Sequence, residues 1–209
     1  MSRAFCYQCH RAKVACLCGR IEKQPNEIQI IVLQHPDEVN NPKGTGIIAE
    51  LGLQQYQKWI AEDFSQHKEL IEFITENDTE TAILYPHEDA YELSEKSGTE
   101  EVLKLKNLIV IDATWRKAKK IWELQPLFQK LVCLRLTDEQ ISNYRIRKVP
   151  KDGYLSTIES VVVALRALEG SKQAYQPLIE LFTEMINFQI NQMGEETYKK
   201  NYRGEINKK

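Results

Sequence analysis

The chain has 209 residues, of which 42% are hydrophobic and 28% are charged, and its formal net charge is −2. These values suit one sizeable domain with a small appendage. No segment approaches the roughly 18 consecutive apolar residues of a membrane span, and the first residues lack the apolar region of a signal peptide. We therefore expect a cytoplasmic protein without a membrane partner.

Positive and negative charges are segregated along the chain. Acidic residues dominate positions 61–101, whereas basic residues dominate 1–23, 144–151 and the tail from Lys199. A basic surface on a mildly acidic protein is typical of a polyanion partner. A solvated charged face would give the same pattern, so this interpretation needs further support.

Four cysteines form two closely spaced pairs near the start of the chain, Cys6-x-x-Cys9 and Cys16-x-Cys18. In a cytosolic protein such pairs favour metal binding over disulfides. Zinc prefers four thiolates in a tetrahedron, and a site filled by protein ligands is structural. We predict a zinc knuckle at 1–25 and a main domain at 26–209. Basic residues within or beside the cysteine pairs are candidates for contact with RNA phosphates, chiefly Arg11 and Lys13, with Arg20 next to them.

Apolar runs predict five strands, at 28–33, 56–61, 82–85, 108–111 and 131–136. Residues with helical spacing follow most of these strands, at 47–51, 114–123, 156–168 and 175–193. A further helix is expected after Ser65, which we interpret as its N-cap. Strands that alternate with helices predict an α/β fold, a mostly parallel sheet with helices on both faces. We interpret the acidic segment up to Lys106 as a loop that borders the cleft.

A carboxylate lies where one strand gives way to a helix. The run from Leu108 ends at Asp112, and helical spacing starts at Thr114. Ligands of open α/β sheets bind outside the carboxyl ends of strands, so Asp112 is placed for chemistry. Asp and Thr are also ordinary helix N-caps, and this alternative stays open. Trp115 falls on the apolar stripe of the helix, which favours core packing over stacking on a ligand.

Other polar residues have simpler interpretations. Ser156 and Glu159 fit a capping box, which gives Glu159 a structural role. Cys133 lies inside a predicted strand, where free cysteine commonly packs. Basic residues after the carboxylate and in the 144–151 segment are candidate phosphate contacts, namely Arg116, Lys119, Lys120, Arg145, Arg147 and Lys148.

Four segments of the chain resemble the DTW-domain proteins. Asp112-Ala113-Thr114-Trp115 matches the D-x-T-W signature of that family. The cysteine cluster, the segment 34–38 (QHPDE) with Thr45-Gly46, and the segment 155–159 (LSTIE) agree in order. Family members are tRNA-uridine aminocarboxypropyltransferases, which move the 3-amino-3-carboxypropyl group of S-adenosylmethionine onto a tRNA uridine. Gly44 departs from the pattern, because the family often has Asn before the Thr.

The resemblance also implies a fold, a donor site and partners. The family is related to the SPOUT methyltransferases, whose chain forms a trefoil knot. S-adenosylmethionine would lie against three loops, and tRNA, not DNA, would be the nucleic-acid partner. The implied donor-binding residues are Tyr85, Pro86, Asp112, Ala113, Thr114, Tyr154, Leu155, Ser156 and Thr157.

A catalytic role for Asp112 follows from the chemistry of the implied reaction. The N3 atom of uridine is a poor nucleophile while it carries its proton, and a carboxylate within hydrogen-bond reach can remove that proton. Two other functions stay open. The same pocket could present the methyl carbon of the donor, as in an RNA methyltransferase, or the knuckle and basic segments could belong to an RNA-binding module without catalysis.

Overall fold

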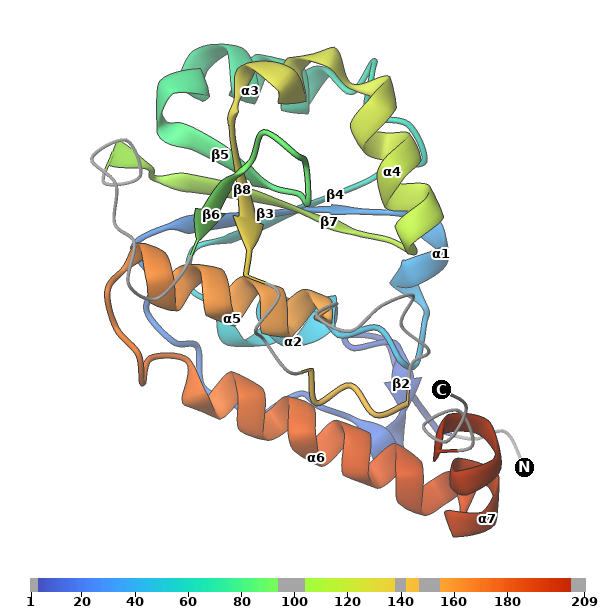
Figure 1. Ribbon diagram of the computed structural model, residues 1–209. Coiled ribbons are helices and arrows are strands. Elements are labelled where there is room, and N and C mark those ends of the chain that lie inside the picture. Colours follow the sequence, from blue (N-terminus) through green and yellow to red (C-terminus); the bar gives the residue numbers. More distant parts are fainter. Residues whose placement is uncertain (1–3, 94–103, 138–141, 147–154, 204–209) are drawn as a thin grey trace.

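The computed structural model describes residues 4–93, 104–137, 142–146 and 155–203, and its centre is a six-stranded sheet (Figure 1). Neighbouring strands in the order β4-β3-β7-β5-β8-β6 all pair in parallel. The strands are β3 (Gln29–Gln34), β4 (Tyr56–Ile60), β5 (Thr81–Leu84), β6 (Tyr91–Leu93), β7 (Asn107–Asp112) and β8 (Val132–Leu136).

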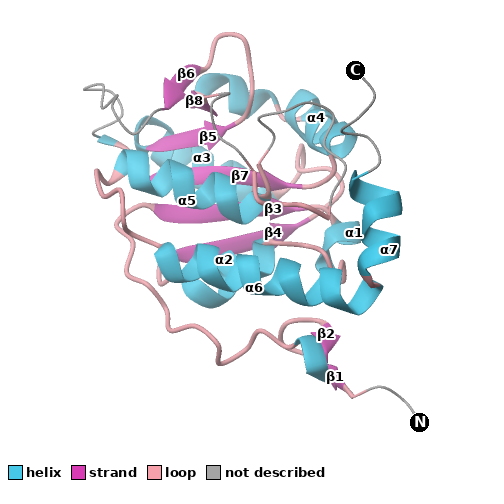
Figure 2. Cartoon of the chain, turned by 60° about the horizontal axis from the view of Figure 1, so that its bottom comes forward, coloured by secondary structure: helices cyan, strands magenta, loops and turns pink. Residues whose placement is uncertain are grey.

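Helices cover both faces of this sheet, as the sequence predicted (Figure 2). One face carries α2, α5 and α6, and the other carries α3 and α4. The helices are α1 (Pro36–Val39), α2 (Gly46–Gly52), α3 (Lys68–Asn77), α4 (Trp115–Leu124), α5 (Thr157–Leu168), α6 (Gln176–Met193) and α7 (Glu195–Tyr198). Shorter helical turns are η1 (Lys13–Ala15), η2 (Asp78–Glu80), η4 (Pro126–Lys130) and the π-helical turn η5 (Lys199–Arg203).

Each strand feeds two hydrophobic cores, because successive side chains point to opposite faces of a sheet. In β3, Ile30 and Val32 join the core under α2, α5 and α6, whereas Ile31 and Leu33 join the core under α3 and α4. All four side chains are fully buried. Burial on both faces explains why the strands appear in the sequence as continuous apolar runs.

Two local expectations were wrong. The acidic segment after Tyr85 is not all loop, because β6 pairs with β8 at the edge of the sheet. Three residues are too few to show a strand period in the sequence. Ser65 does not cap α3, because its N–H bonds to the Asp63 carboxylate in a turn. His67 is the cap, and its Nδ1 accepts from the N–H of Leu70.

The connections after β3 and β7 leave the sheet on opposite faces. Helix α2, after β3, packs in the first core, and α4, after β7, packs in the second. Because β3 and β7 are neighbours, a crevice opens between their carboxyl ends, where open α/β folds bind ligands. The trefoil knot implied by the resemblance stays a prediction.

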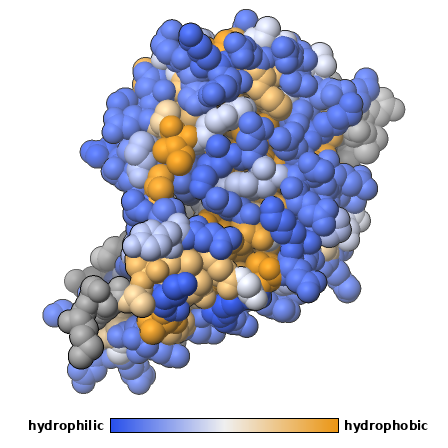
Figure 3. Space-filling model, turned by 180° about the vertical axis from the view of Figure 1, so that it is seen from behind, coloured by the Kyte–Doolittle hydropathy of each residue, from blue (hydrophilic) through white to orange (hydrophobic). Residues whose placement is uncertain are grey.

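The cysteines lie on a small hairpin away from the main sheet. Strands β1 (Phe5–Cys6) and β2 (Arg11–Ala12) pair antiparallel, and the chain then joins the main body through a bridge between Gln24 and Leu53. Seen from behind, the molecule is mostly hydrophilic with a few apolar patches (Figure 3). No helix among the described residues is long and apolar enough to cross a bilayer.

Candidate active site

Asp112 lies at the crevice between β3 and β7 and is held by two side chains. Its backbone is in register with Gln34, whose Nε2 donates to Oδ2 at 2.8 Å. The hydroxyl of Thr157, the first residue of α5, donates to Oδ1 at 2.7 Å. The carboxylate therefore joins two elements and does not cap α4. The N-cap position of that helix belongs to Thr114, whose side chain makes no capping hydrogen bond.

A glycine gives Asp112 the room it needs. A Cβ atom at Gly46 would lie 2.6 Å from Oδ2 of Asp112, closer than real Cβ contacts allow. The preceding residue, Thr45, accepts a hydrogen bond from the N–H of Ile158 through its hydroxyl, at 3.3 Å. The starts of α2 and α5 are therefore fixed around the carboxylate. This packing explains the Thr45-Gly46 pair noted in the sequence.

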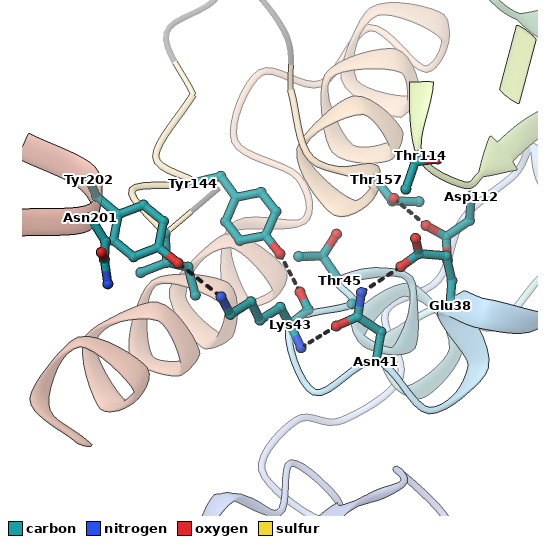
Figure 4. Close-up of a pocket in the computed structure, with 12 residues that line it drawn as sticks. Glu38, Asn41, Lys43, Thr45, Asp112, Thr114, Tyr144, Thr157, Asn201 and Tyr202 are labelled. Carbon is teal, nitrogen blue, oxygen red and sulfur yellow. Dashed lines mark hydrogen bonds between the residues drawn. The ribbon is translucent and has the colours of Figure 1, made fainter. Parts of the chain in front are cut away.

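A cavity of about 420 Å³ opens in front of this carboxylate (Figure 4). It is lined by Glu38, Asn41, Lys43, Gly44, Thr45, Asp112, Thr114, Tyr144, Ile146, Thr157, Asn201 and Tyr202. Glu38 is mostly buried and accepts from Asn41 Nδ2 at 2.7 Å. On the far wall, Lys43 Nζ donates to the Tyr202 hydroxyl at 2.9 Å, and Tyr144 donates to the Lys43 carbonyl. Two carboxylates and one ammonium thus share the cavity wall.

Sequence patterns missed most of this wall. Glu38 lies in the QHPDE segment, but no role was assigned to it, and Asn41, Lys43, Asn201 and Tyr202 were not candidates. Asn201 and Tyr202 belong to η5, which the sequence did not predict. The available signal was the position of QHPDE directly after a predicted strand. Such a segment lies at the same sheet edge as Asp112.

The predicted donor-binding residues divide into three groups. Asp112, Thr114 and Thr157 line the cavity. Pro86 is exposed beyond the end of β5, which neighbours β7, and Tyr85 stacks on Trp122 with ring centroids 4.4 Å apart. The remaining described residues have packing or capping roles: Ala113 packs against the second core, Leu155 is half-buried, and Ser156 caps α5. Tyr154 lies outside the described residues.

Two structural interpretations are confirmed. Ser156 and Glu159 form the reciprocal capping box of α5, and Glu159 also accepts from the N–H of Asn143 at 2.6 Å. Cys133 packs against the second core, and burial raises the pKa of its thiol to about 11. One was wrong. Trp115 is 37% exposed and is absent from both cores, because it begins α4 one turn before the buried stripe at Ala118, Ile121 and Trp122.

The four knuckle cysteines converge in a geometry that fits zinc. Their sulfur atoms all lie within 4.8 Å of one another. Cys6 and Cys18 are 3.8 Å apart, and Cys9 and Cys16 are 3.7 Å apart. A tetrahedron with Zn–S bonds of about 2.3 Å has edges of about 3.8 Å. Backbone N–H groups of Cys9 and Gln8 lower the pKa of the Cys6 thiol to about 6, whereas burial raises the pKa of the Cys16 and Cys18 thiols, so the fit to zinc rests on the sulfur geometry.

Arg11 is removed from the candidate phosphate contacts. It is 4% exposed, and its guanidinium donates to the carbonyls of Pro42 and Gly44, the latter at 2.7 Å. The side chain therefore fastens the knuckle to the loop that lines the cavity. Its Nε and the Oε1 of Gln34 are both buried and find no hydrogen-bond partner among the described residues, and both residues line a void of about 20 Å³.

The other predicted phosphate contacts are exposed where the structure describes them. Arg116, Lys119 and Lys120 project from α4, and Lys13 projects from η1. Arg145 is exposed and donates to Asn187 on α6. Arg147 and Lys148 lie outside the described residues. Five basic side chains that the sequence proposed as phosphate contacts are therefore accessible on the surface, namely Lys13, Arg116, Lys119, Lys120 and Arg145.

Comparison with known proteins gives this arrangement a family. The family model described as "DTW domain" matches residues 3–190. The chain belongs to that family. Its DTW domain therefore includes the knuckle, the crevice and most of α6. No solved structure gives a significant match to the chain.

Named proteins resemble this DTW domain over most of its length. The chain is 29% identical over 196 residues to "tRNA-uridine aminocarboxypropyltransferase 2" of Drosophila melanogaster, and 30% identical over 192 residues to proteins of the same name from Mus musculus and Macaca fascicularis. Each match takes in 90% of this chain. The chain spans 76% of the fly protein and 64% of the mouse and macaque proteins.

Proposed function

We propose that this protein transfers the 3-amino-3-carboxypropyl group of S-adenosylmethionine to N3 of a tRNA uridine and releases methylthioadenosine. Two findings support the proposal. The relatives that match 90% of the chain carry the name of that enzyme. The structure has a cavity at the carboxyl ends of β3 and β7, with the carboxylate of the D-x-T-W signature on its wall. The position of Asp112 is the observation that carries the chemistry.

Asp112 acts as the general base in this proposal. Its two oxygens each accept one hydrogen bond, from Gln34 and from Thr157, which fixes the carboxylate and leaves lone pairs free. It takes the N3 proton as the N3–carbon bond forms and the carbon–sulfur bond breaks. The electron pair of that bond leaves with sulfur, so the sulfonium becomes the neutral thioether of methylthioadenosine. The target base must be unstacked to reach the cavity.

The charges of the cavity wall suit the donor. S-adenosylmethionine carries a positive sulfonium and an α-ammonium beside one carboxylate. Asp112 and Glu38 present two negative charges, and Lys43 presents one positive charge. The two carboxylates attract the positive groups of the donor, and Lys43 attracts its carboxylate. In this proposal these contacts stabilise the amino-acid end of the donor and turn its carboxypropyl carbon toward the acceptor. We propose that the donor also contacts Thr114 and Thr157, with Tyr85, Pro86 and the segment 154–156 nearby.

The proposal also assigns the two domains and the surface that binds tRNA. Residues 1–25 form a zinc knuckle held by Cys6, Cys9, Cys16 and Cys18, and residues 26–209 form the catalytic domain. Transfer RNA contacts Lys13, Arg116, Lys120 and Arg145. Lys119 pairs with Glu123 instead and is not a contact in this proposal. Arg147 and Lys148 remain proposed contacts from the sequence alone.

The test is a reaction of purified protein, S-adenosylmethionine and tRNA from a strain that lacks the corresponding gene. We expect mass spectrometry of the digested tRNA to show aminocarboxypropyluridine, with methylthioadenosine formed in equal amount. Formation of S-adenosylhomocysteine and a methylated base would instead establish a methyltransferase. Binding of tRNA without binding of S-adenosylmethionine would establish a non-catalytic RNA-binding module.

A further inference from the structure

A second cavity, of about 400 Å³, lies beside the first and has no role in the chemistry above. Helix α1 separates the two, since Asp37 lines the second cavity and Glu38 lines the first. The backbone N–H of His35 donates to the Asp112 carbonyl at 3.0 Å, so both cavities adjoin the same strand ends. The second cavity is lined by His35, Asp37, Glu62, Arg116, Lys117 and Lys120.

The charges of this cavity favour an anion. Lys117 forms an ion pair with Asp37, which also lowers the pKa of that carboxyl group. This pairing leaves Arg116 and Lys120 to face Glu62 on the cavity wall, and Lys120 also interacts with Asp63 beside the cavity. The wall therefore carries more cationic side chains than carboxylates, although Glu62 reduces the excess of positive charge.

The start of α4 adds to this positive potential. The positive end of a helix dipole normally attracts acidic residues, yet the first turn of α4 contains none and holds Arg116 and Lys117. Among the described residues the Thr114 side chain makes no capping hydrogen bond, so no side-chain oxygen at the N-cap offsets this charge. A bound anion would stabilise this charge arrangement.

His35 supplies an independent indication of a ligand. It is only 7% exposed, and its Nδ1 accepts from the N–H of Asp37 at 3.1 Å. With Nδ1 as an acceptor, the ring hydrogen lies on Nε2. Within the described part of the chain Nε2 has no hydrogen-bond partner, and the residue lines the cavity. His35 therefore offers one ring N–H donor at the site where cations gather.

We propose that this cavity binds a backbone phosphodiester of the RNA substrate, next to the nucleotide whose base enters the first cavity. Arg116 and Lys120 contact the phosphate oxygens, and His35 donates to one of them through Nε2–H. This fixed point explains how a flipped nucleotide is held by its backbone while Asp112 acts on its base. The choice of RNA as ligand rests on the proposed function, but the phosphate site itself does not require transfer chemistry.

Two lysines on one helix give a matched experiment. Lys120 lines the cavity, whereas Lys119 is also exposed but forms an ion pair with Glu123 at 3.6 Å and does not line it. Affinity for unmodified tRNA is measured across salt concentrations for wild type, Lys120→Ala and Lys119→Ala. We expect Lys120→Ala to reduce the slope of log affinity against log salt by about 0.7 to 0.9, the value of one phosphate contact. Lys119→Ala should leave the slope unchanged.

His35→Phe separates the neutral donor from the cations. It keeps the ring volume and removes Nε2–H, so tRNA affinity should fall roughly tenfold with little change in the salt slope, because no counterion is involved. Thermal melting identifies any variant that has lost its fold, and Lys120→Ala, at an exposed position, serves as the second probe. Equal slopes for the Lys119 and Lys120 variants would overturn the phosphate site.

The outcome is independent of the transferase assay. If wild-type protein forms aminocarboxypropyluridine but the two lysine variants bind tRNA alike, the phosphate site is wrong and the proposed function stands. If only the Lys120 variant loses slope but no such product forms, the phosphate site stands and the proposed function is wrong.

Discussion

Gly46 and Asp112 are in such close contact that a methyl group on the glycine would come within 2.6 Å of Oδ2. Because the obstacle is a carboxylate held by two hydrogen bonds, Gly46→Ala should displace it and reduce turnover strongly. Adding Asp112→Ala removes the clash, so the double variant should be more stable than the sum of the single effects predicts, by about 0.5 to 3 kcal/mol. Chemical denaturation of the four proteins measures this coupling, and simple additivity would contradict it.

Asp112→Asn tests the proposed base directly. The fold should survive, since the Gln34 amide can turn its unpartnered Oε1 toward the new NH₂ group and Thr157 can keep its hydrogen bond. Turnover should fall by roughly 10² to 10⁴, the usual effect of a lost general base, with tRNA affinity almost unchanged. If instead S-adenosylmethionine binds more weakly and turnover at saturating donor is normal, then Asp112 holds the donor and another group takes the proton.

Gln34→Glu tests whether the charge state of Asp112 controls the rate. The introduced carboxylate would lie within hydrogen-bond distance of Oδ2, at the place of the amide nitrogen 2.8 Å away. Like charges at this distance raise the pKa of the pair, so a proton remains bound at neutral pH and the base is blocked. We expect low turnover that recovers as pH rises, with the rising limb of the pH–rate profile displaced upward. An unshifted profile would show that Asp112 is not the base.

Zinc should be present in one equivalent and should depend on the knuckle cysteines only. Elemental analysis of Cys9→Ser should show little metal, because three thiolates and a hydroxyl bind zinc more weakly than four thiolates. Cys133→Ser is the matched control and should keep the full metal content. The Cys133 thiol, with a pKa of about 11, should also react slowly with iodoacetamide at pH 8, where only about one molecule in a thousand is ionised. Metal-free wild-type protein with an intact hairpin would contradict the zinc site.

Arg11→Ala should reduce stability rather than RNA contact. The change removes two charge-assisted hydrogen bonds to the carbonyls of Pro42 and Gly44, which should cost about 3 kcal/mol or more. The salt slope of tRNA binding should stay at the wild-type value, since the guanidinium is buried. Lys13→Ala, in the neighbouring exposed turn, should show the opposite pattern if that lysine contacts phosphate.

The position of Asp112 could be predicted from the sequence because two periodicities meet there. An apolar run gives a buried strand, helical spacing gives α4, and parallel strands end at a common edge. The cysteine geometry was predictable for a similar reason, since short spacings leave the sulfur atoms little freedom. In both cases the information is local in the chain.

The partners of Asp112 were not predictable, because they come from distant segments. Gln34 and Thr157 are 78 and 45 positions away, and nothing in the sequence states which strands are neighbours. Arg11 was misinterpreted for a related reason. Its charge suggested exposure, but two backbone carbonyls, 31 and 33 positions away, replace water around the guanidinium. Tyr202 lies on the cavity wall and belongs to the π-helical turn η5. A turn this short shows no periodic pattern in the sequence, so its position could not be predicted.

The Arg11 contact also connects the proposed zinc site with the cavity, and so would make the proposed activity depend on metal supply. One end of this side chain belongs to the hairpin that carries the cysteines, and the other holds the loop whose Lys43 and Gly44 line the cavity. A zinc-starved cell would contain hairpins without their metal, and the loop would lose its anchor. The aminocarboxypropyl content of newly made tRNA would then follow intracellular zinc even with donor in excess. Nucleoside analysis of cells grown with graded chelator would measure that dependence, and the Arg11→Ala strain should already show the low-zinc level in full medium.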